Sequence, residues 1–454
     1  MGRENPSVQR YARHVNPAFV KLLGAFAYGR VLVRGEGTRL WDDEGRVYED
    51  FLAGFGATNL GHNHPRLIAA IAEHFATMPA NLVHVGPQVH AGDLADALAE
   101  RAGPLTMSAF ASSGGEAVEI ALKLARGYTR RSGFLYCEGG FHGTNFGNLS
   151  VMGHPRLRKP FEPLLEGCTS VPFGDLAALE KALSSKNYAA FLVEPIQAEA
   201  GVVMPPTAFL AEAKRLCERV GTLLVLDEVQ TGIGRTGALF AFEHERVHPH
   251  ILVLGKALGG GICPISVAMT TEEIHQKVLG SMERFDLCSS TFAGNALACR
   301  MALETLRVLD DEKLIEGARA KGERLLAGLR GALGRHPLVR EVRGRGLLIG
   351  IELGPTGQGL VQKLAPMLVK GVAKNVLGQW LSVRMLERGF VCQPASQQWD
   401  VLKIEPPLTV TDEAIDRFVR ELSTLLDEYR DIGSVLADAG ERIGKQALSG
   451  WEFG

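Results

Sequence analysis

Two polar residues, Asp227 and Lys256, each follow an apolar run rich in β-forming residues. The runs, 222–226 and 251–254, have the composition of strands that are buried on both faces of a parallel sheet. The carboxyl ends of such strands form the edge at which α/β sheets bind ligands. A carboxylate and an amine at that edge predict a pyridoxal-phosphate site, with Lys256 as the Schiff-base lysine and Asp227 paired with the pyridinium nitrogen. The alternative is a buried salt bridge or two solvated loop charges.

A cluster of small residues, SSGG at 112–115, precedes an amphipathic helix predicted over residues 116–130. Ser113 and Glu116 have the spacing of a capping box, which is one interpretation of the cluster. The box does not account for the two glycines, which leave backbone N–H groups open at the positive end of a helix. The cluster therefore predicts a phosphate-binding helix N-terminus, and both interpretations can hold together.

Phe141 lies in the glycine-rich run EGGFHG, directly after a strand predicted over residues 134–136. Glycines allow a tight turn that brings the Phe141 ring against a flat ligand. Stacking on a pyridine ring would contribute about 1 kcal/mol beyond burial. The alternative is a core aromatic residue in a turn.

Histidines occur twice at i, i+2 spacing, as His62 with His64 and as His248 with His250. A metal site needs at least a third ligand, and none is evident near either pair. We therefore predict loop histidines and no metal centre.

Strands alternate with helices from about residue 107 to residue 264, and polar residues follow the strand ends. A further such strand, 189–193, is followed by Glu194. This alternation predicts an α/β fold with a mostly parallel sheet. From residue 311 the composition shifts to charged helices and short strands, which predicts a second, smaller α+β unit. The 454 residues exceed the usual size of one hydrophobic core, about 250–300 residues, so two domains are expected.

Composition excludes several classes of partner. The net charge of −2 gives no reason to expect nucleic acid or an anionic membrane. Seven cysteines are scattered without a CxxC pair, which predicts free thiols in a reducing cytoplasm. We expect no signal peptide, because the first residues lack an apolar region, and no membrane span, because no run of about 18 apolar residues occurs.

Nine ordered motifs resemble those of the class III (subgroup II, ω-type) aminotransferases of PLP fold type I, from about Val31 to about Tyr429. They are GHNHP, SSGGEAVEIALKLAR, FHG, VEPIQAEAG, LDEVQTGIGRTG, LGKALGGG, STFAGN, VRGRGL and KIEPPL. Within the class, the sequence looks most similar to putrescine and ornithine-type aminotransferases. The resemblance implies a large domain (66–310) with a seven-stranded-type sheet, a small domain (311–430), an N-terminal segment (1–65) that joins the small domain or a dimer arm, and a tail (431–454).

The resemblance also implies a role for each matching residue. Lys256 would bind pyridoxal 5'-phosphate and shuttle a proton, and Asp227 would keep the cofactor ring nitrogen protonated. Around the cofactor ring, Gln230 would contact the ring hydroxyl, Phe141 would stack on the ring and His142 would lie beside it. The phosphate would be bound by Ser113, Gly114 and Gly115 together with Thr291 of the partner subunit. Glu194 would lie near the cofactor-side network. Because two subunits would share each site, a homodimer is implied.

One position departs from the family pattern. Many relatives have an arginine before the PPL motif, where it binds the α-carboxylate of glutamate, and this chain has Lys403 there. Lysine offers a point charge rather than a bidentate fork, so carboxylate binding is expected to be looser. The family's glutamate that covers the arginine corresponds to Glu199. A Glu199–Lys403 gate for dual substrate use is the hypothesis, and a plain surface ion pair is the alternative.

Two stretches are atypical of the family: the apolar segment 360–381 and the segment 392–399. They could line a roomier substrate channel for a larger biosynthetic aldehyde, or they could be packing for the small domain.

The resemblance implies a ping-pong aminotransferase that moves an amino group between a terminal (ω) amine or aldehyde and glutamate or 2-oxoglutarate. Alternatives are amination of a larger biosynthetic aldehyde in a secondary-metabolite pathway, an aminomutase of the glutamate-semialdehyde type, and a scaffold that has lost catalysis. The intact Asp227, Lys256 and phosphate loop argue against the scaffold. Fold alone cannot decide between these reactions.

Overall fold

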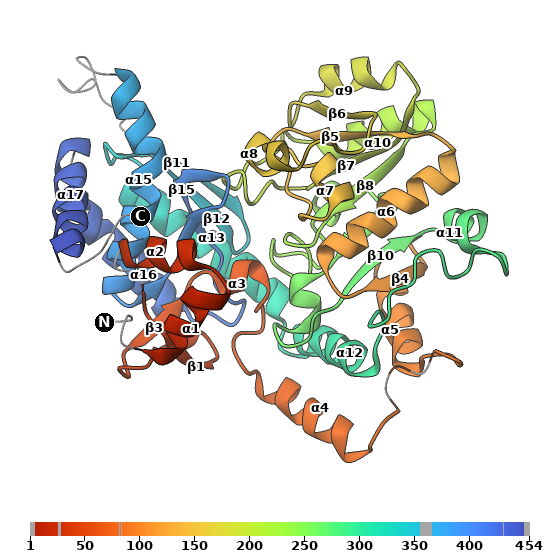
Figure 1. Cartoon of the computed structure of the whole chain (residues 1–454), viewed down its shortest axis with the longest axis horizontal. Helices are drawn as coiled ribbons and strands as arrows, with labels where there is room; N and C mark the ends of the chain where they lie inside the picture. The colour runs from red at the N-terminus through yellow and green to blue at the C-terminus, as the bar shows by residue number, and fades with distance from the viewer. Residues whose placement is uncertain are drawn as a thin grey trace.

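The computed structural model describes residues 5–25, 29–80, 82, 84–354, 366–429 and 431–448. Figure 1 shows two lobes, a larger one at the right and a smaller one at the left. The first helices, α1 (Pro6–His14) and α2 (Pro17–Ala25), lie in the smaller lobe beside the last helices of the chain. The chain therefore starts in the smaller lobe, crosses to the larger one and returns.

A seven-stranded sheet forms the centre of the larger lobe. Its strands are β4 (Met107–Ala111), β5 (Gly133–Cys137), β6 (Cys168–Val171), β7 (Tyr188–Val193), β8 (Leu223–Asp227), β9 (Ile251–Leu254) and β10 (Ser266–Thr270). The strand order is β4-β10-β9-β8-β7-β5-β6, and only β10 runs antiparallel to its neighbours. The predicted α/β class with a mostly parallel sheet is confirmed.

The register of the central strands brings their carboxyl ends to one edge. Val193 of β7 pairs with Leu226 of β8, and Asp227 pairs with Val253 of β9. The residues that follow these pairs, Glu194 after β7 and the turn after β9, leave the sheet at the same edge. This register places the polar residues of the candidate site next to one another.

The two faces of the sheet pack in separate hydrophobic clusters, as the period of two along a strand requires. On β5, Phe134 and Tyr136 face one cluster and Leu135 and Cys137 face the other. Helices α6 (Gly114–Thr129) and α11 (Glu272–Leu279) cover the first face. Residues of α9 (Leu176–Leu183), α10 (Phe209–Val220) and α12 (Ala296–Asp311) belong to the cluster on the second.

Shorter elements complete the larger lobe: α4 (Pro65–Ala76), α5 (Val89–Ala99), α7 (Phe146–Ser150), α8 (Pro155–Arg158), η1 (Lys159–Phe161), η2 (Ala241–Glu245) and η3 (Lys256–Gly259). Helix α12 packs against α4, α5 and η3, so it supports the turn that carries Lys256.

Two four-stranded sheets form the smaller lobe. One has the order β1-β2-β3-β13, and the other is antiparallel with the order β11-β12-β15-β14. Their strands are β1 (Leu32–Glu36), β2 (Arg39–Asp42), β3 (Val47–Asp50), β11 (Val339–Arg345), β12 (Leu348–Leu353), β13 (Phe390–Val391), β14 (Gln393–Ala395) and β15 (Gln398–Ile404). The helices are α3 (Ala53–Gly56), α13 (Leu314–Leu333), α15 (Pro366–Glu387), α16 (Asp412–Asp427) and α17 (Ile432–Leu448). Strand β13 pairs with β3, which joins the first segment of the chain to the last.

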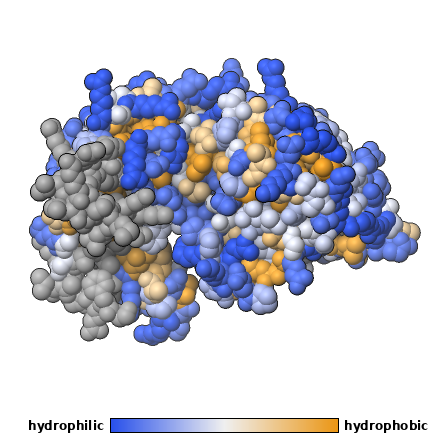
Figure 2. Space-filling view, turned by 90° about the horizontal axis from the view of Figure 1, so that it is seen from above, coloured by the Kyte–Doolittle hydropathy of each residue, from blue (hydrophilic) through white to orange (hydrophobic). Residues whose placement is uncertain are grey.

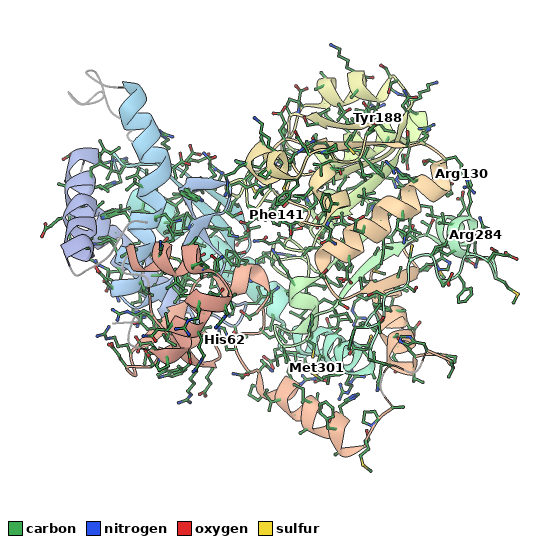
Figure 3. All side chains as sticks on the ribbon, in the orientation of Figure 1. His62, Arg130, Phe141, Tyr188, Arg284 and Met301 are labelled. Carbon is green, nitrogen blue, oxygen red and sulfur yellow. The ribbon has the colours of Figure 1, made fainter. Side chains whose placement is uncertain are left out.

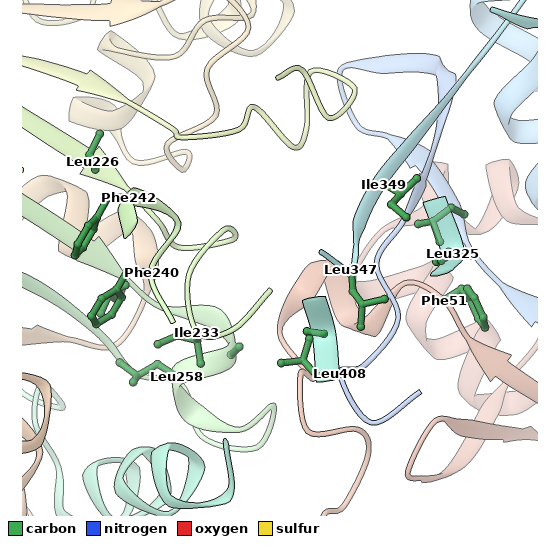
Figure 4. Packing of buried hydrophobic residues seen from close by; sticks show 14 of the residues in the cluster. Phe51, Leu226, Ile233, Phe240, Phe242, Leu258, Leu325, Leu347, Ile349 and Leu408 are labelled. Atoms are coloured by element: carbon green, nitrogen blue, oxygen red, sulfur yellow. The ribbon is translucent and has the colours of Figure 1, made fainter. Parts of the chain in front are cut away.

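The two lobes share one hydrophobic core. Figure 4 shows buried side chains that continue from Ile233 and Leu258 of the larger lobe to Leu347 and Leu408 of the smaller one. A Cβ atom on Gly234 would lie 2.9 Å from the Leu408 side chain, so a glycine is required for this close approach.

Arg235 fixes the same junction by hydrogen bonds. Its guanidinium has no exposed surface and donates to the carbonyl oxygens of Leu347 (2.9 Å) and Pro406 (2.5 Å) and to the side chain of Asn59. Burial lowers the pKa of Arg235 to about 10, which still leaves it charged at neutral pH. The junction that borders the candidate site is therefore rigidly defined.

The surface in Figure 2 is mostly hydrophilic, with smaller hydrophobic areas between the polar side chains. Among the described helices, none is long and apolar enough to cross a membrane. Within the described ranges, no three His, Cys, Asp or Glu side chains are grouped so that they could hold a metal ion. His62 and His64 instead pair with separate carboxylates, of Asp50 (2.8 Å) and Glu312 (3.3 Å).

Candidate active site

Lys256 begins the turn η3 directly after β9, two residues beyond the last strand residue. Its backbone has a φ of 44°, a left-handed conformation that is uncommon for a residue with a side chain. The Nζ atom donates a hydrogen bond to Oε1 of Gln230. Burial lowers the pKa of Lys256 below its ordinary value, although the carboxylates of Glu199 and Glu405 act in the opposite direction. A lysine in this environment reaches its neutral, nucleophilic form more readily than an exposed one.

Asp227 ends β8 and is almost fully buried. Its Oδ2 accepts a hydrogen bond from Nδ1 of His142 (2.8 Å), and its Oδ1 accepts one from the backbone N–H of Val229 (3.1 Å). Because a carboxylate only accepts, the proton of the imidazole lies on Nδ1. The other ring nitrogen, Nε2, is buried and has no partner among the described residues. The His142 ring therefore holds the Asp227 carboxylate in place.

Glu194 follows β7 at the same edge. Its Oε1 accepts a hydrogen bond from the backbone N–H of Phe141 (2.8 Å), which ties the glycine-rich run to the sheet. Burial, together with the nearby charge of Asp227, raises the pKa of Glu194 well above its ordinary value. Phe141 itself is half-buried, and Figure 3 places it where the two lobes meet.

The small-residue cluster lies between β4 and the first turn of α6. Ser113 is the N-cap, and its hydroxyl accepts from the backbone N–H of Glu116 (3.3 Å). The carboxylate of Glu116 accepts from the N–H of Ser112 (2.9 Å) rather than from that of Ser113. The reciprocal capping box predicted from the spacing is therefore wrong by one residue, because the chain before the cap turns enough to present Ser112 instead.

The two glycines of this cluster are required by close packing. A Cβ atom would lie 2.9 Å from the Val229 side chain if placed on Gly114, and 2.9 Å from Nδ2 of Asn148 if placed on Gly115. A Cβ on Gly255, the residue before Lys256, would lie 3.6 Å from the Cα of Gly114. The N-terminus of α6 and the lysine turn are therefore neighbours at the sheet edge.

Thr291 lies in an exposed part of the chain. It belongs to segment 281–295, its side chain is exposed, and within the described residues no hydrogen bond joins it to the other predicted cofactor residues. The same segment exposes Met282, Phe285 and Phe292, at 90%, 71% and 59% of their surface.

Glu199 and Lys403 form an ion pair deep in the protein. The Lys403 side chain has no exposed surface and that of Glu199 has 7%, so a plain surface pair is excluded. Burial alone would raise the pKa of Glu199, but the charges of Lys403 and Lys256 outweigh it and lower the pKa to about 2. Burial alone would lower the pKa of Lys403, but the carboxylates of Glu405 and Glu199 raise it above its ordinary value.

Glu405 is a member of this cluster that the sequence did not single out. Its Oε1 lies 2.8 Å from Nζ of Lys403, and its Oε2 accepts from Nε2 of Gln230 (2.9 Å). A continuous path of hydrogen bonds and ion pairs therefore runs from Lys256 through Gln230, Glu405 and Lys403 to Glu199. The signal that could have found Glu405 is its position two residues after Lys403, on the same side of an extended chain.

The residues that meet at this edge fit pyridoxal phosphate. The amine of Lys256, whose pKa is lowered, and the buried carboxylate of Asp227 follow neighbouring strands. The N-terminus of α6 lies beside the lysine turn and carries no side chain at Gly114 and Gly115. A helix N-terminus of this kind binds phosphate groups.

Comparison with known proteins identifies the family. The model of the aminotransferase class-III family matches residues 25–426, and the chain belongs to that family, whose members depend on pyridoxal phosphate and have PLP fold type I. The predictions of family, fold and cofactor are confirmed.

Individual relatives agree with this assignment. The chain is 34% identical over 456 residues to the aminotransferase PigE of Serratia sp. (strain ATCC 39006). The matched region covers 93% of this chain and 53% of that protein. The chain thus spans about half the length of that curated relative. The ornithine aminotransferase of Toxoplasma gondii is 33% identical, with a TM-score of 0.79 over 88% of this chain and 91% of that one. The acetylornithine aminotransferase of Elizabethkingia anophelis is 32% identical, with a TM-score of 0.73 over 91% and 99% of the two chains.

Proposed function

We propose that this protein is a ping-pong aminotransferase that moves an amino group between a terminal (ω) amine or aldehyde and glutamate or 2-oxoglutarate. The observation that carries the proposal is the path of hydrogen bonds and ion pairs from Lys256 to the buried Glu199–Lys403 pair. This path connects the amine of Lys256, which is suited to covalent catalysis, with the ammonium of Lys403. We propose that the carboxylate of Glu199 pairs with this ammonium or moves away from it, depending on the substrate. Such a site can accept both an amine without a carboxylate and a keto acid with one.

Lys256 is proposed as the residue that binds the cofactor and moves the proton. Pyridoxal phosphate, when bound, supplies an electron sink for a carbanion at the substrate carbon. The Lys256 Nζ, whose pKa is lowered by burial, would in its neutral form accept a proton from the amine-bearing carbon and deliver it to the cofactor. Gln230 positions Nζ by accepting its hydrogen bond, and is also proposed to contact the ring hydroxyl.

The remaining cofactor residues are proposed to orient the ring and the phosphate. Asp227, oriented by His142, keeps the ring nitrogen protonated, which makes the ring a better electron sink. Phe141 would stack on the ring, and Glu194 holds the Phe141 backbone in place. The N-terminus of α6, with Ser113, Gly114 and Gly115, binds the phosphate.

We propose a homodimer with shared sites. The segment 281–295 carries Thr291 and exposes large apolar side chains, among them Phe285 and Phe292, to solvent. Covering such side chains with a second copy would bury apolar surface and would bring Thr291 of the partner subunit to the phosphate. We also propose that the chain divides into domains at residues 65, 310 and 430, as the resemblance to the family implies. A cytoplasmic location is proposed as well, which is consistent with seven cysteines that form no disulfide bond.

The Glu199–Lys403 pair is proposed as the gate for the two substrates. When an amine without a carboxylate enters, the pair stays closed. When glutamate or 2-oxoglutarate enters, Glu199 moves aside and Lys403 binds the carboxylate. The pair is buried, so this exchange takes place away from bulk water. An ion pair contributes more in such a low-dielectric environment than it does in water.

The alternatives remain predictions. Amination of a larger biosynthetic aldehyde depends on the segments 360–381 and 392–399, and residues 360–365, with the side chains of 366–375, lie outside what the structure describes. An aminomutase of the glutamate-semialdehyde type would need no external acceptor, so dependence on 2-oxoglutarate separates it from the proposal.

The test is a substrate panel on the purified holoenzyme. Diamines, ω-amino acids, α-amino acids and simple amines are added one at a time without an acceptor, and loss of the visible absorption of the bound cofactor is followed. The proposal expects rapid loss with diamines or ω-amino acids and with glutamate. A response to α-amino acids alone would refute it.

A further inference from the structure

Lys403 faces two carboxylates, and all three side chains are buried. Its Nζ contacts Glu199 and lies 2.8 Å from Glu405, which has no exposed surface. The ring centre of Phe55 lies 5.1 Å from Nζ, so the ammonium has an aromatic neighbour as well. With both carboxylates ionised, this three-residue cluster carries one net negative charge rather than being neutral.

The two carboxylates are held very differently. Glu199 lies in the loop after β7 and is held through the backbone N–H of Ser396 (3.0 Å) besides Lys403. Glu405 follows β15 directly, its own N–H donates to the carbonyl of Phe51 (3.0 Å), and its second oxygen accepts from Gln230. Moving Glu199 breaks its hydrogen bond to Ser396 and its ion pair with Lys403, whereas moving Glu405 would also break the connection through Gln230 to Lys256.

We propose that Glu405 is a specificity-determining residue that weakens carboxylate binding by Lys403 and so biases the site towards amines without an α-carboxylate. This inference rests on the proposed function and deepens it. When Glu199 moves aside, Lys403 is still paired with Glu405. An incoming carboxylate then meets a neutral pair instead of a free cation, and it must also approach the negative charge of Glu405.

The test compares the holoenzyme with its Glu405→Gln variant. Glutamine keeps the shape and can still accept from Gln230, but it removes the charge. Glutarate, an unreactive dicarboxylate, is titrated by calorimetry, so the readout does not depend on turnover. Once Lys403 is released from the charge of Glu405, its hydrogen bond to glutarate is stronger, so the dissociation constant for glutarate should fall roughly tenfold to hundredfold. The rate with diaminobutane should fall or stay unchanged.

Three further variants test whether the effect comes from the charge of Glu405 and acts through Lys403. In a Lys403→Gln background, Glu405→Gln should leave glutarate affinity within about threefold, because the cation that Glu405 neutralises is gone. Glu341→Gln is the matched control: it removes an exposed carboxylate from β11 at the edge of the same sheet and should change nothing. Glu405→Ser removes the charge without an amide and should tighten glutarate binding in the same direction, which keeps the test available if the glutamine variant does not fold.

The outcomes separate this inference from the proposed function. Glutarate binding that is unchanged or weaker in Glu405→Gln, in a wild-type enzyme that transaminates diaminobutane, overturns the role of Glu405 alone. A wild-type holoenzyme that transaminates no amine or ω-amino acid overturns the proposed function, regardless of its measured affinity for glutarate.

Discussion

Replacing Lys403 with methionine, which has a similar length and no charge, should destabilise the protein and impair one substrate class. The side chain is fully buried and contacts two carboxylates. Removing one partner of a buried ion pair typically costs about 3–5 kcal/mol, because the remaining charge is left without a counterion. Here two charges, on Glu199 and Glu405, would be left facing each other.

The loss of stability should depend on pH in a defined direction. In the wild type, the pKa of Glu199 is lowered to about 2, so its contribution to stability is complete above its ordinary pKa of 4.5 and is lost as the pH falls towards 2. In Lys403→Met the ammonium that lowers this pKa is absent, and protonation relieves the repulsion between the carboxylates. The difference in free energy of unfolding between the two proteins should therefore shrink as the pH falls from about 7 to about 4.

Urea unfolding of the holoproteins at several pH values measures this difference. Lys321→Met is the matched control, because Lys321 is half-buried and its Nζ donates to the carbonyl oxygen of Leu408 (3.1 Å) rather than to a carboxylate. Its loss should cost only about 1 kcal/mol. A difference for Lys403→Met that stays constant or grows as the pH falls would refute the charge argument.

The same Lys403→Met variant should discriminate between substrates. The Michaelis constant for 2-oxoglutarate should rise roughly tenfold to hundredfold, as expected for the loss of a hydrogen bond to a charged group. The constant for diaminobutane should change far less. Equal effects on the two substrates would refute the gate.

Three further variants test the cofactor residues. Lys256→Ala should abolish both the visible absorption of the bound cofactor and turnover, and turnover at the wild-type rate would contradict its assignment. Asp227→Asn can still accept the hydrogen bond from His142, so cofactor binding should persist while the turnover number falls roughly 10²–10³-fold, measured by steady-state kinetics. Gly115→Ala places a Cβ 2.9 Å from Asn148, so equilibrium dialysis should show cofactor affinity reduced about tenfold or more; unchanged affinity would exclude this turn from the phosphate site.

The sequence predicted the framework of the site because that framework follows from local pattern. The runs before Asp227 and Lys256 are apolar and short, and β8 and β9 occupy nearly the ranges expected for them. Their parallel pairing follows from alternation with helices, and parallel strands bring their ends to one edge. The resemblance then identified the family, which the comparisons confirm.

What the sequence did not predict depends on contacts between distant segments. Lys403 and Glu199 are far apart in the chain, and their burial at the junction of the lobes is a result of packing that no local pattern encodes. Glu405 was missed for the same reason, since its partners Gln230 and Lys403 come from different lobes. Helix α17 was also missed as a packed element, although Trp380 donates to its Asp438 (2.7 Å).

We expect amino nitrogen to move from a terminal amine to a keto acid at the site around Lys256. Diaminobutane labelled with a heavy nitrogen isotope, incubated with the holoenzyme and 2-oxoglutarate, tests it most directly by mass spectrometry of the glutamate formed. We expect glutamate that carries the label in wild type and none in Lys256→Ala. Unlabelled glutamate, or label transfer that persists in Lys256→Ala, would contradict it.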